Sequence, residues 1–206
     1  MNYIENIYIC LMAPILISIM CIRSRGKQMM IFILAGMTAC LLSSYISTFL
    51  AAAYQMDYTT AAISLTPFIE EIMKLLPTLF FLLVFEPQRL EIPYCPFMIA
   101  VGFATLENVC YLVQNGTSEF LNLLIRGFGT GTMHIFCGSI TFAGLLLLWD
   151  KRWLRLVGTF GLVAVAITYH AIYNMLVLQS GIISYIGYLI PLVSVALSVF
   201  QIRRLS

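Results

Sequence analysis

Long apolar stretches, each long enough to cross a lipid bilayer, are the feature that most constrains the fold. The 206-residue chain is 61% hydrophobic and 10% charged, whereas a soluble domain carries about 25% charged residues. A transmembrane helix needs about 20 apolar residues. Seven stretches qualify: 3–22, 28–53, 60–85, 95–114, 120–149, 154–178 and 182–202. The sequence therefore predicts an all-α, polytopic transmembrane bundle of about seven spans, with residues 1–206 forming a single transmembrane domain.

Basic residues between the apolar stretches predict the orientation. Lys and Arg concentrate on the cytoplasmic side of membrane proteins. In this chain they cluster in the first and fifth connections and at the C-terminus: Arg23, Arg25, Lys27, Lys151, Arg152, Arg155, Arg203 and Arg204. The even-numbered connections carry none, although Arg126 lies near the outer end of the fifth span. We expect a multi-pass protein of a cell membrane, with its N-terminus outside and its C-terminus in the cytoplasm.

Ionisable and amide side chains interrupt four of the apolar stretches. The residues are Glu70, Glu71, Lys74, Glu107, His134, His170 and Asn174. A charge in lipid costs at least a few kcal/mol, so such residues face a protein interior or a water-filled cavity. At a rise of about 1.5 Å per residue, the predicted orientation places these groups at similar depths in the outer half of the bilayer. The sequence thus predicts one shared polar cavity.

The third span holds two adjacent carboxylates and a lysine. Glu70 and Lys74 are four residues apart on one helix face, so we expect them to pair. Glu71 is rotated by about 100° and can point elsewhere. A neutralised carboxylate beside a free one is a way to keep a single base available. A purely structural ion-pair network remains the alternative.

The fourth span carries a glutamate that needs a cation. Phe103, Glu107 and Tyr111 recur at four-residue spacing and share a face. A buried carboxylate needs a partner, and the available cations are Lys74 and Arg126. A helix-packing cluster without a direct role in a reaction remains open here.

The fifth span contains Gly127, Gly129 and Gly131, and we expect the helix to begin or break at these glycines. Gly138 follows His134 by one turn, which predicts space beside the imidazole. Glycines and threonines here would also allow close helix packing.

The sixth span places His170 and Asn174 one turn apart on the same face. Both side chains could donate to one oxygen, as in an oxyanion hole. The same pair could be a metal ligand and its hydrogen-bonded partner, or a structural pair that joins two helices.

Taken together, the motifs of these spans resemble the PrsW family of intramembrane proteases. They read Glu70-Glu71-x-x-Lys74, Phe103-Ala-x-x-Glu107-Asn108-x-x-Tyr111, Arg126 followed by His134, and His170-x-x-x-Asn174. The resemblance covers about residues 67–174 and reaches the wider superfamily of CAAX-prenyl proteases. Lys74 favours PrsW, because the CAAX-type enzymes carry an arginine one residue later.

This resemblance implies a catalytic core over about 60–178. It implies site-one cleavage of a membrane-anchored anti-sigma factor on the extracytoplasmic side of a bacterial membrane. The expected partners are a single-span membrane protein substrate and the lipid bilayer, and no nucleic acid. The resemblance also implies that the glutamate pair and both histidines carry the reaction.

Our hypothesis from these residues is peptide-bond hydrolysis. Glu70 would act as the general base with Glu71 as its support, and with His134 they would bind and activate a water. His170 and Asn174 would stabilise the oxyanion. The supporting residues would be Lys74, Glu107, Asn108 and Arg126. In a zinc version of this site, the ligands would be His134, His170 and Glu71, with an open position for water.

Two other classes of function remain open at this point. Buried Glu, Lys and His also form proton relays, so the chain could be a proton-coupled transporter. Many carriers are built from two halves with a repeated motif. The two halves of this chain share none, which counts against the transporter class. A non-catalytic scaffold that holds a single-span partner is the third class.

Overall fold

The chain folds into a bundle of long helices. The computed structural model describes residues 4–22, 25–85, 94–115, 120–148 and 152–205. Its elements are α1 (Ile4–Cys21), α2 (Arg25–Ala53), α3 (Tyr58–Thr60), the π-helix η1 (Ala61–Leu65), α4 (Thr66–Phe85), α5 (Tyr94–Asn115), α6 (Phe120–Leu148), α7 (Arg152–Val177) and α8 (Ile182–Leu205). Because α3, η1 and α4 follow one another without interruption, the described chain has seven long helical rods. The predicted all-α polytopic bundle is confirmed.

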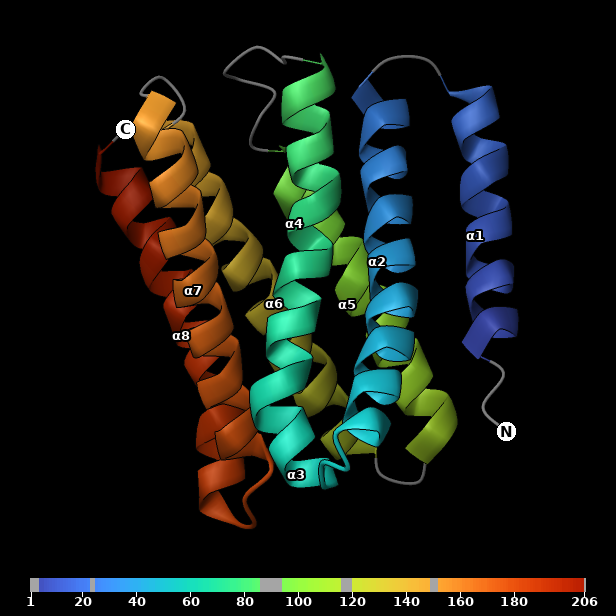
Figure 1. Cartoon of the computed structure of the whole chain (residues 1–206), viewed down its shortest axis with the longest axis vertical. Helices are drawn as coiled ribbons and strands as arrows, with labels where there is room; N and C mark the ends of the chain where they lie inside the picture. The colour runs from blue at the N-terminus through green and yellow to red at the C-terminus, as the bar shows by residue number, and fades with distance from the viewer. Residues whose placement is uncertain (1–3, 23–24, 86–93, 116–119, 149–151, 206) are drawn as a thin grey trace.

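The contacts between helices arrange α2, α4, α7, α6 and α5 in a ring, with α4 and α5 also touching across it. Helices α1 and α8 lie at opposite sides of the bundle (Figure 1). Around the ring, α2 packs against α4, α4 against α7, α7 against α6, α6 against α5 and α5 against α2. Helix α1 packs on the outside against α2 and α5, and α8 packs against α6 and α7. The ring therefore encloses whatever its inward faces carry.

Four of the described helices are long and apolar enough to cross a membrane by length and composition. They are Ile4–Cys21, Gly26–Ala53, Tyr94–Gln114 and Val157–Val177. Helix α4 differs from these because it carries Glu70, Glu71 and Lys74 within its 20 residues. Arg23 and Lys151, which contribute to the predicted orientation, lie outside the described residues, so the orientation stays a prediction.

Helices α2 and α5 approach each other closely at two glycines. Between helices in lipid there is little hydrophobic driving force, so close contact of small residues supports association. Gly36 of α2 faces the backbone carbonyl of Ile99, and Gly102 of α5 faces that of Ile33. A Cβ atom at either glycine would overlap the facing carbonyl oxygen. The two glycines therefore set the distance between these helices.

We expect Gly36→Ala and Gly102→Ala each to destabilise the protein by about 1–3 kcal/mol, because the added methyl overpacks a helix contact. Thermal unfolding in detergent micelles measures the effect. Gly127→Ala is the matched control, since a Cβ there meets nothing within 4 Å. Equal midpoints for Gly36→Ala and Gly127→Ala would contradict this account of the α2–α5 contact.

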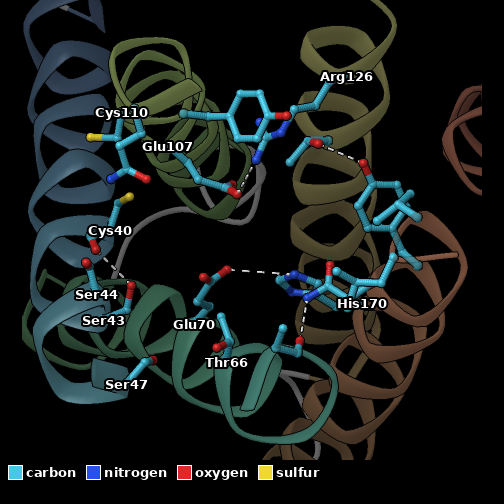
Figure 2. Close-up of a pocket in the computed structure, with 18 of the residues that line it drawn as sticks. Cys40, Ser43, Ser44, Ser47, Thr66, Glu70, Glu107, Cys110, Arg126 and His170 are labelled. Carbon is cyan, nitrogen blue, oxygen red and sulfur yellow. Dashed lines mark hydrogen bonds and ion pairs between the residues drawn. The ribbon is translucent and has the colours of Figure 1, made fainter. Parts of the chain in front are cut away.

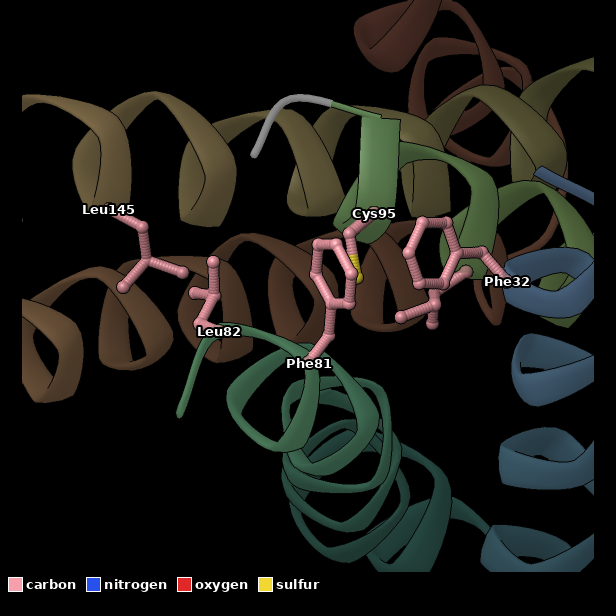
Figure 3. Close-up of a cluster of buried hydrophobic side chains, with 6 residues drawn as sticks. Phe32, Phe81, Leu82, Cys95 and Leu145 are labelled. Atoms are coloured by element: carbon pink, nitrogen blue, oxygen red, sulfur yellow. The ribbon is translucent and has the colours of Figure 1, made fainter. Parts of the chain in front are cut away.

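Apolar side chains pack together at the end of the ring opposite α3. Phe32, Phe81, Leu82, Cys95, Ile99 and Leu145 form a buried cluster that joins α2, α4, α5 and α6 (Figure 3). The rings of Phe32 and Phe81 meet edge to face, with centroids 4.8 Å apart. Such pairs contribute about 0.5–1.5 kcal/mol beyond their buried area. The cluster and the polar cavity described below thus occupy different levels of the ring.

The expected start or break of the fifth span at Gly127, Gly129 and Gly131 is wrong. Helix α6 runs without interruption from Phe120 to Leu148. A Cβ at Gly129 would lie 2.6 Å from Cδ1 of Tyr188 in α8. That glycine thus serves close packing of α6 against α8, and packing outweighs the lower helix propensity of glycine.

Space beside His134 at Gly138 was also expected, and the contacts there show close packing instead. A Cβ at Gly138 would lie 2.9 Å from Cβ of Ala100 and 3.0 Å from the carbonyl oxygen of Pro96. Gly138 therefore lets α6 approach α5, and the imidazole one turn away is fully buried.

Candidate active site

A polar cavity of about 570 Å³ lies in the ring, toward the end that carries α3 (Figure 2). Helices α2, α4, α5, α6 and α7 all contribute to its wall, together with residues of α1 and α8. Of the site residues expected from the sequence, Glu70, Glu107, Arg126, His170 and Asn174 line the cavity. Glu71, Lys74 and His134 are buried behind this wall. The four spans that carry the motifs do converge, but only some of their polar side chains face the cavity.

The lysine of α4 pairs with Glu71. Nζ of Lys74 lies 2.6 Å from Oε1 of Glu71, and the two side chains are only 7% and 4% exposed. The expected Glu70–Lys74 pair is therefore wrong. At three-residue spacing, Glu71 and Lys74 share the face that turns toward α6 and α7, while Glu70 turns into the cavity. As expected, one of the two carboxylates is paired with the lysine and the other is open to the cavity. The paired one is Glu71 and the open one is Glu70, the reverse of the expected order.

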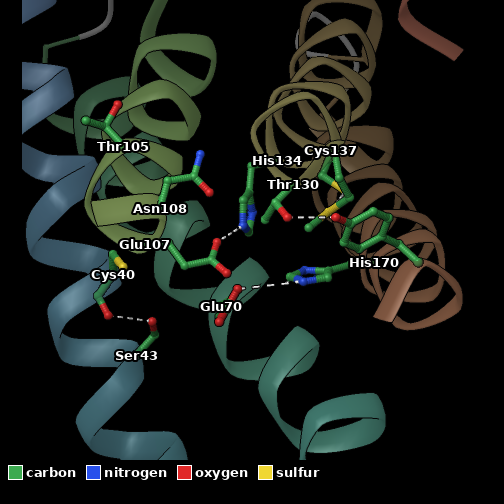
Figure 4. A network of polar contacts seen from close by, with 12 residues as sticks. Cys40, Ser43, Glu70, Thr105, Glu107, Asn108, Thr130, His134, Cys137 and His170 are labelled. Carbon is green, nitrogen blue, oxygen red and sulfur yellow. Dashed lines mark hydrogen bonds and ion pairs between the residues drawn. The ribbon is translucent and has the colours of Figure 1, made fainter. Parts of the chain in front are cut away.

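Glu71 also holds the imidazole of α7. Nδ1 of His170 lies 2.9 Å from Oε1 of Glu71. An ionised carboxylate only accepts hydrogen bonds, so this contact assigns a proton to Nδ1. In the neutral imidazole, Nε2 then carries a lone pair. That nitrogen faces Oε2 of Glu70 at 3.7 Å (Figure 4), which is too long for a hydrogen bond.

The open carboxylate has an unsatisfied oxygen. Within the described part of the chain, Oε2 of Glu70 is enclosed and has no hydrogen-bond partner. Leaving such a group unpaired costs about 1–3 kcal/mol, and more when it is charged. Glu70 Oε2 and His170 Nε2 are two acceptors that face each other. Their arrangement is suited to a cation or a hydrogen-bond donor placed between them.

His134 bridges the ion pair of α4 to the glutamate of α5. Its Nδ1 lies 3.0 Å from Nζ of Lys74, and its Nε2 contacts Oε2 of Glu107. An ammonium group only donates, so Nδ1 accepts and Nε2–H donates to Glu107. The ring of His134 also lies edge-on to that of His170, with centroids 5.1 Å apart. Both imidazoles therefore belong to one connected network.

Arg126 supplies the cation that Glu107 needs. Its Nη2 lies 3.4 Å from Oε1 of Glu107, and its Nη1 donates to Oδ1 of Asn108 at 3.0 Å. The guanidinium also lies 3.5 Å from the ring centroid of Tyr111. Of the two cations that the sequence offered, it is Arg126 that contacts the carboxylate directly. These contacts fix the start of α6 against the end of α5.

Asn174 has a structural partner at the π-helical turn. In η1, the backbone N–H of Thr66 donates to the carbonyl of Ala61, five residues earlier. The next donor in this register would be residue 67, but Pro67 has no N–H. Nδ2 of Asn174 donates instead to the carbonyl of Ala62, at 2.8 Å. The amide expected to bind an oxyanion thus completes a helix turn just before Glu70.

We expect Asn174→Leu to destabilise the protein by about 1–3 kcal/mol, because the Ala62 carbonyl loses its donor. Adding Pro67→Ala should restore most of the loss, since alanine brings back a backbone N–H. Unfolding midpoints of the single and double variants measure this. Pro77→Ala lies in the same helix and serves as the control that should not rescue Asn174→Leu. Equal behaviour of the two proline variants would contradict the assigned role.

Three residues could hold a metal ion together. Glu70, His134 and His170 each offer one ligand atom, and these atoms lie within 4.8 Å of one another. Two histidines, one carboxylate and an open position form a common catalytic zinc set. The 3.7 Å between Glu70 Oε2 and His170 Nε2 is close to the roughly 3.4 Å between ligands of a tetrahedral zinc with bonds of about 2.1 Å. The unpartnered Glu70 oxygen therefore fits a metal.

The ligand set differs from the expected one in its carboxylate. The sequence suggested Glu71, but its Oε1 is bonded to Lys74 and His170. A carboxylate that binds the far nitrogen of a metal-ligating histidine orients that ligand, and Glu71 stands in this position toward His170. His134 could join through Nε2 only by giving up its contact with Glu107.

Several cavity residues were missed by the sequence reasoning. The hydroxyls of Tyr173 and Thr130 lie 2.7 Å apart, and both line the cavity. Tyr173 follows His170 by three residues, so helical spacing alone could have placed it there. Ser43 and Ser47 of α2 also line it; that span was read only as apolar, although its serines recur at four-residue spacing.

Comparison with known proteins gives one family. A sequence model described as PrsW family intramembrane metalloprotease matches residues 24–200. The match begins after α1 and includes all the ionisable and amide side chains of the site described above. Among curated proteins and solved structures, no significant match to the chain was found.

Proposed function

The chain belongs to the PrsW family of intramembrane metalloproteases, and on this premise we propose that it cleaves a single-span, membrane-anchored anti-sigma factor at the cavity that holds Glu70. Of the three classes that the sequence left open, family membership supports the protease. A protease of this kind acts on membrane proteins within the bilayer. The anti-sigma substrate, the site-one step and a bacterial cell membrane are parts of the proposal.

One observation carries the assignment of the reacting groups. Glu70 Oε2 is enclosed without a partner among the described residues, and it faces Nε2 of His170 at the wall of a cavity large enough for a peptide segment. The neighbouring Glu71 is committed to Lys74. These contacts support Glu70, of the two adjacent carboxylates, as the one that would meet substrate and water.

The proposed reaction is hydrolysis with Glu70 as general base. Its carboxylate takes a proton from a water molecule, and the resulting hydroxide adds to the peptide carbonyl carbon. The same carboxyl group then returns the proton to the amide nitrogen as the C–N bond breaks, which leaves a carboxylic acid and an amine. General acid–base catalysis of this kind contributes about 10²- to 10⁴-fold. Tyr173, whose hydroxyl lines the cavity, can donate to the oxyanion.

A zinc ion is the metal that this ligand set fits best. Glu70, His134 and His170 would hold it, and when bound it would supply Lewis-acid polarisation of the substrate carbonyl. Glu71 keeps His170 oriented in either case. Glu70 has two carboxylate oxygens, so ligation through Oε2 leaves the other for the proton.

The position of the cavity supports cleavage near the outer face. Its wall includes Tyr58, Gln114 and Leu178, which lie at the ends of spans next to the even-numbered connections. Those connections carry no Lys or Arg, and the positive-inside rule places such connections outside the cytoplasm. We therefore propose that the substrate is cut in the outer half of the membrane or just beyond it.

The test of this function is direct cleavage. Purified protein in liposomes is incubated with single-span membrane proteins tagged at both ends, including an anti-sigma factor. We expect two fragments whose new termini map to the outer part of the span. Intact substrates under all lipid and metal conditions, together with ion flux through the same liposomes, would favour the transporter class instead.

We expect the purified protein to hold about one zinc ion per chain. His170→Ala should lower that ratio severalfold, because it removes one of three ligands. Elemental analysis after removal of free metal gives the ratio without any activity assay. Cys137→Ala is a suitable control, since its thiol contacts the Ala166 carbonyl and is not part of the cluster. A ratio unchanged by His170→Ala would contradict the assigned site.

A further inference from the structure

A row of hydroxyl side chains on α2 faces the catalytic cavity. Ser43, Ser44, Ser47 and Thr48 line its wall, and we call them the hydroxyl stripe. Their spacing of three and four residues places them on one face of the helix. Figure 2 shows the three serines along the α2 side of the cavity that also contains Glu70 and His170. A helix that spans lipid thus carries a polar wall toward the reacting groups.

Hydrogen bonding within the stripe is incomplete. Oγ of Ser43 donates to the carbonyl of Cys40 at 2.9 Å, and Oγ1 of Thr48 donates to that of Ser44 at 2.8 Å. Both hydroxyls donate their hydrogen bond to a carbonyl of their own helix, and their oxygen lone pairs can still accept one. Oγ of Ser47 is enclosed and has no partner in the described part of the chain. The stripe therefore offers acceptors to a group that enters the cavity.

An unwound substrate would present the matching donors. In a transmembrane helix, each backbone N–H and C=O is paired within the helix, because an unpaired group in lipid costs several kcal/mol. A peptide bond must leave that pairing before water can attack its carbonyl. The freed backbone groups then need partners supplied by the protease. Hydroxyls both donate and accept, so they can pair with either kind of group.

We propose that the hydroxyl stripe binds the unwound backbone of the substrate, and that Ser47 Oγ accepts a hydrogen bond from a substrate N–H close to the cleaved bond. The inference rests on the proposed function, since it names how a membrane-spanning substrate is held. The ligand class is a locally extended segment of a single-span protein, bound through its main chain. Ser47 thereby contributes to substrate binding and takes no part in proton transfer.

The experiment measures binding to inactive protein, so that it does not depend on turnover. The probe is a synthetic, dansyl-labelled single-span peptide with a Leu-Ala core and a Gly-Ser-Gly break in its outer third. A series of esters replaces single amides around the break, each deleting one N–H. Binding to the Glu70→Gln protein is titrated in bicelles. We expect one ester to weaken binding about fivefold, the effect of one net hydrogen bond.

The decisive result is a double-mutant cycle. Adding Ser47→Ala should weaken binding of the unmodified peptide by a similar factor, and the critical ester should then cause no further loss. Ser47→Thr keeps the hydroxyl and should retain the ester effect. Ser64→Ala is the matched control, because its exposed Oγ donates to the Thr60 carbonyl at 2.7 Å outside the cavity.

The outcomes separate this inference from the proposed function. Ester effects that are identical with and without Ser47, or a peptide that does not bind, would overturn the inference. Wild-type protein that cuts the peptide despite such a result would still support the protease. Wild-type protein that binds through Ser47 and leaves the peptide intact would count against the protease and not against the binding site.

Discussion

Replacing Glu70 with glutamine is expected to reduce cleavage by about 10²- to 10⁴-fold, the contribution of a general base. The amide has nearly the same shape but cannot take a proton from water. The protein should stay folded, because Oε2 of Glu70 has no hydrogen-bond partner to lose among the described residues. Removing an enclosed charge also removes a desolvation cost. Initial rates on a tagged single-span substrate and unfolding midpoints measure the two effects.

The adjacent glutamate provides the matched comparison. Glu71→Gln should also lower activity, but with a clear loss of stability, because it leaves the ammonium of Lys74 buried without its ionic partner. Removal of one member of a buried pair typically costs 3–5 kcal/mol. Opposite results for the two positions, with Glu71→Gln stable and inactive and Glu70→Gln unstable and active, would exchange their assigned roles.

The convergence of the polar residues could be predicted because lipid restricts where charges can lie. Glu70, Glu107 and His170 are on three spans that the sequence identifies from hydropathy alone. Once the spans are fixed, the rise per residue gives each group a depth, and similar depths require a common interior. The same reasoning required a cation beside Glu107, since a buried carboxylate needs one. It left Lys74 and Arg126 as candidates, and the structure has Arg126 there.

The choice of partners within the network could not be predicted in the same way. Glu70 and Glu71 can both reach Lys74 along a helix. Which of the two shares the buried side with Lys74 depends on how α4 is rotated about its own axis relative to the neighbouring helices. That rotation depends on the π-helical turn at 61–65, where one extra residue shifts the helix face by about 100°. The turn is stabilised by Asn174, 112 residues later in the chain. Hydrophobic periodicity contains no signal for such a contact.

Replacing Lys74 with methionine is expected to destabilise the protein by about 3–5 kcal/mol, the same cost as that expected for Glu71→Gln, because each variant breaks the same buried pair. Methionine keeps most of the aliphatic stem but removes the ammonium that contacts Oε1 of Glu71 and Nδ1 of His134. Among the described residues, His170 would then be the one hydrogen-bond partner left to the buried carboxylate of Glu71. Denaturation in mixed micelles gives the change in unfolding free energy.

Two further variants decide whether the lost ion pair is the cause. Lys74→Met combined with Glu71→Gln should recover a large part of the stability, because the second change removes the uncompensated charge. Lys27→Met tests the loss of a lysine at an exposed position, where ionic contacts contribute about 0–1 kcal/mol. If the double variant is as unstable as Lys74→Met alone, the cost comes from packing around residue 74. That result would reject the role of the Glu71–Lys74 pair in positioning His170 opposite Glu70.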